Sequence, residues 1–390
     1  MHWNSLSRRE CLVSAAALAA SAVVDVPAFG ASATPSRASL FPGERVTSGA
    51  GFPALAMFRR GERSKPLVLL PGGGHLGRVF YGHPGARDED FLLTHLSRAG
   101  FSTLALSYPT SHPVLDRAMP QMTIAQWSAT AADIAAEYIG REQLPRRVIA
   151  AAWSLGGRLA RDILIELRTR AIDLEVFISL SGAPPMPGFG VLSQADLKLS
   201  PAGLRDDSSA QSSIFKSREA HLAVVDEING RVVLPRQAYA DLYVADSPIN
   251  FRGEAERYRD HGLVTDLEAA IRDQGSFDFA NYPLCADVSA THPTDMVHAL
   301  ANSSLWGCLS AQALYHRVVQ PALTRRQLSQ AEWAQLRQLM DGLTAQLTRH
   351  VDGSHFFFVG EAGSKATSRH MVTLAENAEA IKRELTALLS

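Results

Sequence analysis

Apolar and polar positions follow two different rhythms between residues 66 and 185. Short, almost continuous apolar runs occur at 66–70, 101–106, 147–152 and 174–180. Between them lie amphipathic stretches with helical spacing, at 90–99, 123–139 and 155–170. Strands that alternate with helices of this length predict βαβ crossovers, and continuous apolar strands suit a sheet that is covered on both faces. We therefore expect the α/β class, with a mostly parallel central sheet and helices on both faces.

This alternation breaks after residue 185. Residues 186–281 are polar and contain no clear buried strand, although helical patterns appear at 219–229 and 235–245. The earlier rhythm then returns, with strands at 284–290 and 347–351 and helices at 296–319, 329–345 and 371–389. We interpret residues 186–281 as a helical lid, inserted so that it covers one end of the sheet.

The first 33 residues have the features of an export signal. Arg8 and Arg9 precede an apolar stretch at 12–24, and Ala31-Ser32-Ala33 supplies small residues for cleavage. This segment resembles a twin-arginine signal peptide, which implies the twin-arginine export machinery as a partner and a periplasmic or secreted destination. An ordinary secretory signal or an uncleaved membrane anchor are the alternatives. We interpret residues 34–50 as a linker and residues 51–390 as one domain with the lid insertion.

Composition and charge narrow the classes of function. The chain has 390 residues, of which 46% are hydrophobic and 20% are charged, as in ordinary globular proteins. Lys and Arg number 38 against 39 Asp and Glu, so the net charge of −1 indicates no nucleic-acid partner. No stretch after residue 40 is apolar enough to span a membrane. After export two cysteines remain, Cys285 and Cys308, which form either a disulfide or two buried thiols.

The strongest chemical signal is the segment Ala152-Trp153-Ser154-Leu155-Gly156-Gly157, which lies between an apolar strand and an amphipathic helix. A nucleophile elbow needs this context and small residues two positions before and after the nucleophile, which here are Ala152 and Gly156. A serine that caps the helix is the structural alternative. The pattern indicates that Ser154 is a catalytic nucleophile.

On this motif the chain resembles the α/β-hydrolase superfamily, over residues 52–185 and 283–390. The resemblance implies a nucleophile after the fifth strand, an acid after the seventh and a histidine after the eighth. It also implies an oxyanion site in the loop after the third strand, where Pro71-Gly72-Gly73-Gly74-His75 stands. Glycines let backbone N–H groups approach an oxyanion, so we assign the donors to Gly73 or Gly74 and to Leu155. A phosphate-binding loop is less consistent, because no G-K-[ST] follows.

Of the 13 histidines, His355 is the best candidate for the general base. It follows the last strand, and the chain order Ser, Asp, His is that of this fold. A structural loop histidine is the alternative, and His370 is the second choice for the base.

The acid is assigned to Asp295, which follows the strand at 284–290. There a carboxylate would orient the imidazole and stabilise its cation. Asp295 could instead cap the following helix. Asp287, nearer the strand interior, and Asp352, local to the histidine, are the other candidates.

Other side chains have a structural and a functional interpretation. The aromatic residues of the lid pack in the core or form a substrate wall, and residues near the oxyanion loop could line the pocket. These residues are Tyr239, Tyr243, Phe251 and Tyr258 in the lid, and His75, Tyr81 and His83 near the loop. No metal-ligand motif and no G-x-G-x-x-G follow a strand, so we expect no metal and no cofactor.

The sequence therefore predicts an exported serine hydrolase that cleaves a small-molecule or polymeric carboxylic ester through an acyl-enzyme. An amide, thioester or lactone is the alternative substrate for the same triad. Haloperoxidase or acyltransferase chemistry would use the same residues, and a non-catalytic binding protein on the same scaffold is the interpretation from another class.

Overall fold

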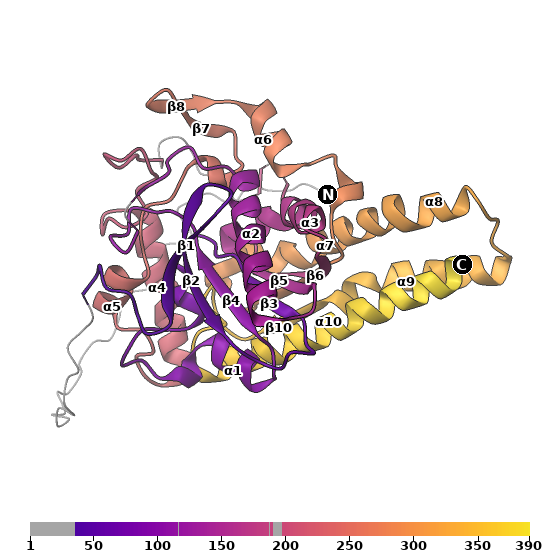
Figure 1. Cartoon of the computed structure of the whole chain (residues 1–390), viewed down its shortest axis with the longest axis horizontal. Coiled ribbons are helices and arrows are strands. Elements are labelled where there is room, and N and C mark those ends of the chain that lie inside the picture. Colours follow the sequence, from indigo (N-terminus) through magenta and orange to yellow (C-terminus); the bar gives the residue numbers. More distant parts are fainter. Residues whose placement is uncertain (1–35, 116, 187, 190–196) are drawn as a thin grey trace, which may run out of the picture. The chain divides into compact units, whose positions relative to one another are not determined.

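A computed structural model describes residues 36–390 except 116, 187 and 190–196 (Figure 1). The expected signal peptide therefore lies outside the described residues. The centre of the fold is an eight-stranded sheet with the order β1-β2-β4-β3-β5-β6-β9-β10. Its strands are β1 Glu44–Gly49, β2 Phe52–Arg59, β3 Leu67–Leu70, β4 Thr103–Ser107, β5 Arg147–Trp153, β6 Asp173–Leu180, β9 Cys285–Ala290 and β10 Thr348–Val351. β1 and β2 pair antiparallel with their neighbours, and every pair from β4 to β10 is parallel. The mostly parallel sheet is thus confirmed.

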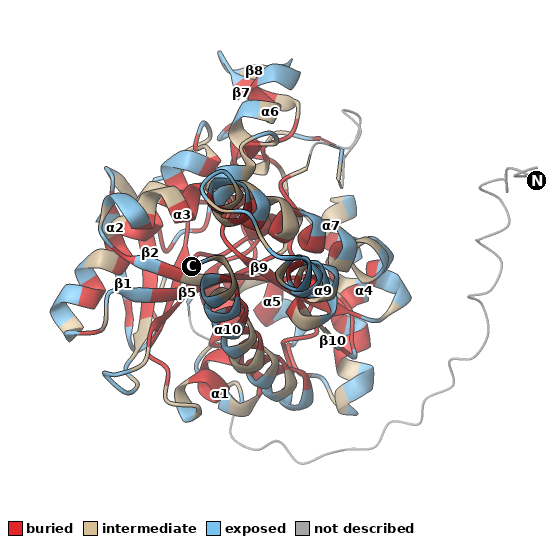
Figure 2. Cartoon of the chain, turned by 90° about the vertical axis from the view of Figure 1, so that its right-hand side faces the viewer, coloured by how far each residue is buried: buried red, intermediate tan, exposed pale blue. Residues whose placement is uncertain are grey.

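Helices cover both faces of this sheet, as the continuous apolar strands predict (Figure 2). Within β3, Val68 and Leu70 join one apolar cluster, whereas Leu67 and Leu69 join the other. The first cluster includes residues of α1 Leu92–Arg98, α9 Gln330–Leu347 and α10 Glu361–Leu389. The second includes residues of α2 Ile124–Glu142, α3 Ala160–Thr169 and α7 Met296–Leu314. Because both faces of the sheet are buried, these strands show no alternation of apolar and polar residues.

The predicted linker at 34–50 is wrong in its second half. Residues 44–49 form β1, which pairs with β2 in the register Glu44↔Met57 to Gly49↔Phe52. This edge strand is mostly polar, and its exposed residues alternate only in part with buried ones. Glu44 is buried because its carboxylate binds Arg78, with Nε 2.7 Å from Oε1. A polar sequence at a sheet edge therefore concealed a strand.

Helix ends differ from the predicted ones in two places. α2 runs through Gly140 to Glu142 and is closed by Gln143, whose φ of +54° supplies the left-handed cap. α10 starts at Glu361, earlier than the predicted 371–389, because its first turns are polar but still pack in the fold. After α7 the chain continues through a π-helical turn, Tyr315–Val319, into α8 Gln320–Leu323.

The insertion between β6 and β9 contains α4 Ser213–Asn229, α5 Arg236–Leu242, α6 Leu267–Gln274 and a separate hairpin. The hairpin strands, β7 Glu256–Arg259 and β8 Gly262–Thr265, were not predicted, because both are short and half exposed. The four lid aromatics Tyr239, Tyr243, Phe251 and Tyr258 are all buried, so core packing is the correct interpretation for them. No described helix is both long and apolar enough to cross a membrane.

Cys285 and Cys308 are not bridged. Cys285 is buried in β9 and Cys308 is exposed on α7. The sequence left a disulfide or two buried thiols as alternatives. Neither is correct, because one thiol is buried and the other is exposed.

Candidate active site

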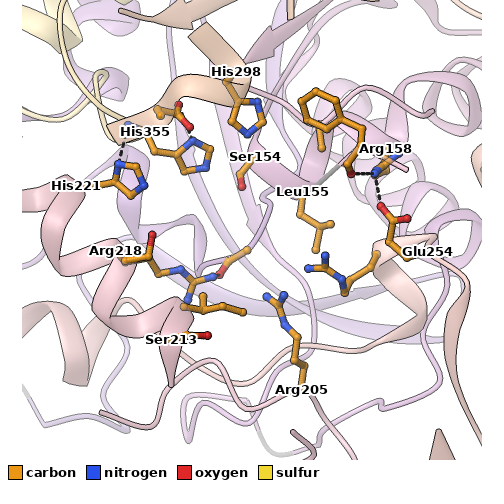
Figure 3. A pocket seen from close by; sticks show the side chains of 17 residues that line it. Ser154, Leu155, Arg158, Arg205, Ser213, Arg218, His221, Glu254, His298 and His355 are labelled. Carbon is orange, nitrogen blue, oxygen red and sulfur yellow. Dashed lines mark hydrogen bonds and ion pairs between the residues drawn. The ribbon is translucent and has the colours of Figure 1, made fainter. Parts of the chain in front are cut away.

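Ser154 lies at the sharp junction between β5 and the short 3-10 helix η3 Ser154–Leu159. Its φ is +54°, a left-handed conformation that is uncommon outside glycine and that concentrates at functional sites. Gly156 lets the turn close, since a Cβ at that position would lie 2.3 Å from the carbonyl oxygen of Gly72. The side chain of Ser154 faces a cavity (Figure 3). The geometry is that of a nucleophile elbow, with the residue at the start of a helix.

The glycine loop after β3 packs directly on this elbow. A Cβ at Gly73 would lie 2.1 Å from the carbonyl oxygen of Trp153 and 2.6 Å from the amide nitrogen of Gly156. The Cβ position of Gly74 is 3.9 Å from Oγ of Ser154, and Gly74 and Leu155 both line the cavity. The amide of Leu155 is in the first turn of η3, where N–H groups have no partner within the helix. The loop and the elbow thus bring the predicted oxyanion donors beside the serine.

Asp295 and His355 meet at the same edge of the sheet. Asp295 ends the turn after β9, and His355 lies in the loop after β10, which pairs parallel with β9. Because parallel strands end at one edge, the two loops are adjacent, and the amide of His292 donates to the carbonyl oxygen of Gly353 at 2.9 Å. Nδ1 of His355 is 3.0 Å from Oδ2 of Asp295. This contact leaves Nε2 of His355 for a second partner.

The ring of His355 is held by its surroundings. Nε1 of Trp153, the residue before the serine, donates to the carbonyl oxygen of His355 at 2.8 Å. Burial alone would raise the pKa of Asp295, but the charge and the hydrogen bond of His355 outweigh it, and the pKa is lowered. A carboxylate kept ionised behind Nδ1 suits the orientation of an imidazole and the stabilisation of its cation.

The other candidates for the base and the acid lie elsewhere. His370 is within α10 and does not line the cavity. Asp287 is buried in β9, where Ser179, Ser289 and Asn302 donate hydrogen bonds to it. Asp352 accepts instead from the exposed Thr291, with Oγ1 to Oδ1 at 3.2 Å.

Two histidines that the sequence did not single out flank His355. The ring of His298, on α7, stacks on that of His355 with centroids 5.0 Å apart. Nδ1 of His221, on α4, accepts from the amide of His355 at 3.4 Å. Burial, with the charge of His355 second, lowers the pKa of each to about 4, so both are neutral at pH 7. No spacing predicted either residue, because one comes from the insertion and the other from a helix.

Asp295, His298 and His355 also form a cluster whose potential ligand atoms lie within 4.8 Å of one another. The sequence did not indicate this group, because its three residues are not arranged in a motif of fixed spacing. Within it, Nδ1 of His355 and Oδ2 of Asp295 already bind each other. Nδ1 of His298 lies 3.2 Å from Oδ1 of Asn302. The bond between His355 and Asp295 suits the orientation of a general base, and both rings keep Nε2 outside these two bonds.

The cavity beside Ser154 has a volume of about 420 Å³, within the range of small-molecule sites. Gly74, Leu155, Asp295 and His355 line it together with the serine. The insertion adds a polar wall that includes arginines, as Figure 3 shows for Arg205 and Arg218. None of the four lid aromatics lines the cavity, and a substrate wall built from them is therefore wrong.

The side chains near the oxyanion loop are structural. Nε2 of His75 lies 2.6 Å from the hydroxyl of Tyr239, and Nδ1 of His83 lies 2.6 Å from the hydroxyl of Tyr243. The hydroxyl of Tyr81 donates to Glu44 at 2.7 Å. They connect the loop region to the insertion and to β1 and do not line the cavity.

The strand order and the connections define an α/β-hydrolase fold. In the sheet's chain order β5 is the fifth strand, β9 the seventh and β10 the eighth, and Ser154, Asp295 and His355 follow them in turn. These are the positions that the family resemblance implied for the nucleophile, the acid and the base.

Several solved structures are distantly similar to this chain. No family model and no curated protein match the chain. Among solved structures, a hyperthermophilic esterase from Pyrobaculum calidifontis is 15% identical with a TM-score of 0.44, covering 88% of this chain and 85% of that one. A thermophilic esterase from Thermogutta terrifontis is 10% identical with a TM-score of 0.42, covering 89% and 100%. A variant of AqdC, which ring-cleaves the Pseudomonas quinolone signal, is 14% identical with a TM-score of 0.45, covering 85% and 99%.

Proposed function

We propose that this protein is a serine hydrolase that cleaves a carboxylic ester through an acyl-enzyme. Oγ of Ser154 attacks the carbonyl carbon while Nε2 of His355 accepts the hydroxyl proton. The amides of Gly73 or Gly74 and of Leu155 stabilise the oxyanion, and Asp295 holds the imidazolium. Collapse of the intermediate breaks the ester bond, and His355 gives its proton to the departing alkoxide. A water molecule, deprotonated by the same histidine, then releases the acid and restores the serine.

The observation that carries this proposal is the pairing of His355 with Asp295, 3.0 Å apart, beside a serine at φ +54°. A capping serine needs neither a left-handed φ nor a histidine–carboxylate pair at the same cavity. A binding protein without activity would not need the glycine loop to approach the elbow so closely. The same groups would also cleave an amide, a thioester or a lactone. Measuring kcat/KM for a panel of these substrates shows which leaving group the protein prefers.

The direct test replaces the nucleophile. Ser154→Ala should lower kcat for p-nitrophenyl esters by about a thousandfold or more, because known triads lose that much when the serine is removed. Ser304→Ala, on an exposed position of α7, is the matched control and should leave kcat unchanged. Activity should also survive dialysis against a chelator. Activity that is lost to the chelator and restored by a divalent metal would favour metal chemistry at Asp295, His298 and His355 instead.

We further propose that the protein is exported by the twin-arginine route and acts in the periplasm or outside the cell. The support is the segment with Arg8 and Arg9 before an apolar stretch and Ala31-Ser32-Ala33. Replacing both arginines by lysine should retain the protein in the cytoplasm as a longer precursor, seen by fractionation and mass spectrometry. Unchanged export of the double variant would contradict this route.

A further inference from the structure

The wall of the cavity is rich in positive charge, most of which the insertion supplies. Among the described lining residues, four arginines stand against two carboxylates, Glu254 and Asp295. Asp295 already binds His355. The sequence as a whole is almost neutral, with a net charge of −1, so this concentration of guanidinium groups is local.

Arg158 and Arg205 each bind a carboxylate. Arg158 binds Glu254 and also donates to the carbonyl oxygens of Pro184 and Met186, at 2.6 and 2.9 Å. Arg205 forms an ion pair with the buried Asp207, with Nη2 2.6 Å from Oδ1. These pairs fix the arrangement of the wall, and Glu254, like Asp295, is bound to a neighbouring side chain.

Arg218 is different. It is 8% exposed, and its Nη2 donates to the carbonyl oxygen of Gly74 at 3.0 Å. Its Nη1 is buried without a hydrogen-bond partner, and none of the carboxylates that the structure describes lies within 4.0 Å of its guanidinium. A buried guanidinium with an unused donor is costly unless an acceptor binds it. Because Arg218 lines the cavity, a substrate is the available source of that acceptor.

Arg252 adds to the same field. It lines the cavity, and burial lowers its pKa to about 9, with the charge of Arg205 as the next cause. The carboxylates of Asp207 and Glu254 act against this shift, so Arg252 contributes a guanidinium to the wall without being the group that the inference depends on.

The start of α4 points to the same kind of ligand. Ser213 and Ile214 of its first turn and Ser217 of the next turn line the cavity, and the preceding Ser212 makes no side-chain capping bond. The N-terminus of a 17-residue helix carries partial positive charge and amides that have no partner in the helix. In Figure 3, Ser213 and Arg218 lie together, on the other side of Ser154 from His298 and His355.

We infer that the preferred ester carries an anionic group, a carboxylate or a phosphate, which Arg218 and the first turn of α4 bind while the ester carbonyl lies at Ser154. This inference rests on the proposed ester hydrolysis and names its substrate class. Guanidinium groups bind carboxylates and phosphates with the same paired donors, so the chemistry of the wall fits both. The volume of about 420 Å³ suits a small anionic ester.

The test compares esters of matched length with different charge at the far end of the acyl chain. p-Nitrophenyl hexanoate is neutral, mono-p-nitrophenyl adipate carries a carboxylate, and the 5-phosphonopentanoate ester carries a phosphonate. A 5-trimethylammoniopentanoate ester supplies the positive charge. The protein should hydrolyse at least one anionic ester with a kcat/KM about tenfold or more above that of the neutral ester, and the cationic ester most slowly. The adipate and phosphonate arms decide which anion is preferred.

Arg218→Gln should lower the ratio of anionic to neutral kcat/KM by about tenfold to a hundredfold, as expected for a charged hydrogen bond. The ratio isolates charge recognition, because loss of the bond to Gly74 would affect both esters. Arg337→Gln, an exposed arginine on α9, is the matched control and should leave the ratio unchanged. Ser213→Asp places a carboxylate in the first turn of α4, where it suits the helix, and should also lower the ratio. This second variant keeps the test decisive if Arg218→Gln does not fold.

The outcomes separate this inference from the proposed function. Equal rates for neutral and anionic esters, or an unchanged ratio in folded Arg218→Gln and Ser213→Asp, would overturn the anionic substrate. If the anionic substrate is overturned but Ser154→Ala still loses hydrolysis of the neutral ester, the proposed ester hydrolysis stands. Failure of every ester in the panel would overturn the proposed function first.

Discussion

Asp295 and Asp287 belong to the same strand and turn, yet their surroundings give the two carboxylates opposite character. Burial raises the pKa of Asp287 to about 6, against the hydrogen bonds from Ser179, Ser289 and Asn302. The pKa of Asp295 is lowered, because the charge and hydrogen bond of His355 outweigh its burial. A carboxylate that remains charged at neutral pH is the one suited to stabilise an imidazolium.

The residue-scale prediction compares three aspartates. Asp295→Asn should lower kcat/KM by about ten-thousandfold, since in known triads the amide removes the charge and favours the wrong imidazole tautomer. Asp287→Asn and Asp352→Asn should remain within about tenfold of the wild type, since neither contacts His355. Ester kinetics on each variant, after circular dichroism has established folding, measure the difference. Collapse of the Asp287 or Asp352 variant with an active Asp295 variant would assign the acid elsewhere.

At this scale the sequence indicated Ser154, His355 and Asp295 because each follows an apolar strand within a short distance. It did not indicate His221, His298 or Arg218. His221 and Arg218 lie on a helix of the insertion, and their side chains reach the cavity only through the tertiary fold. A local sequence pattern can predict that a loop residue lies at the edge of the sheet. It cannot predict which side chains of a helix far away in the sequence face the site.

Among the elements, the glycine loop after β3 and the elbow after β5 depend on each other. Carbonyl and amide groups of the elbow occupy the space that a side chain at Gly73 would need. The loop can therefore place its amides near Ser154 only if no Cβ intervenes.

The element-scale prediction is that Gly73→Ala lowers kcat about a hundredfold or more, as loss of one oxyanion donor does elsewhere. The reason is that a Cβ 2.1 Å from the carbonyl oxygen of Trp153 forces the loop away from the serine. Gly140→Ala is the matched control, because its Cβ meets no atom within 4 Å and it lies inside α2. That variant should keep full activity and gain up to about 1 kcal/mol of stability from helix propensity. Kinetics and urea unfolding measure both; an active Gly73→Ala enzyme would exclude the loop from the oxyanion site.

The sequence predicted the parallel strands of the sheet and missed the antiparallel β1 and β2 and the separate hairpin. β2 was missed although the middle of the strand is apolar and buried. β1 and the hairpin of β7 and β8 have few buried positions, so no hydrophobic period distinguishes them from loops. The late start predicted for α10 has the same cause, since its first turns contain Glu361, Ser364 and Lys365. Tertiary packing decides the structure of such segments.

For the molecule as a whole, the buried Asp287 couples folding to pH. Its pKa is about 6 in the folded protein and near 3.8 in an unfolded chain, so the folded state binds the proton more tightly. The stability that this group contributes is therefore fully present below about pH 4 and is lost as the pH rises to about 6.

The whole-molecule prediction follows from that sign. Asp287→Asn removes the charge at every pH, so the free energy of unfolding of the variant minus that of the wild type should rise by about 2 kcal/mol from pH 4 to pH 7. Urea unfolding at several pH values measures it. The buried histidines His221 and His298 destabilise the fold in acid, but they are present in both proteins and cancel in the difference. Asp352→Asn, at an exposed position, should give a flat difference; a flat or falling difference for Asp287→Asn would contradict its raised pKa.

The central claim is that Ser154 is a nucleophile activated by His355 and Asp295, and a covalent label tests it most directly. A fluorophosphonate probe reacts with activated serines and leaves a stable adduct, which peptide mapping by mass spectrometry assigns to one residue. We predict a single adduct on Ser154, slow labelling of Asp295→Asn and none of Ser154→Ala. An adduct on another serine, or full esterase activity in a protein that the probe does not label, would contradict the account.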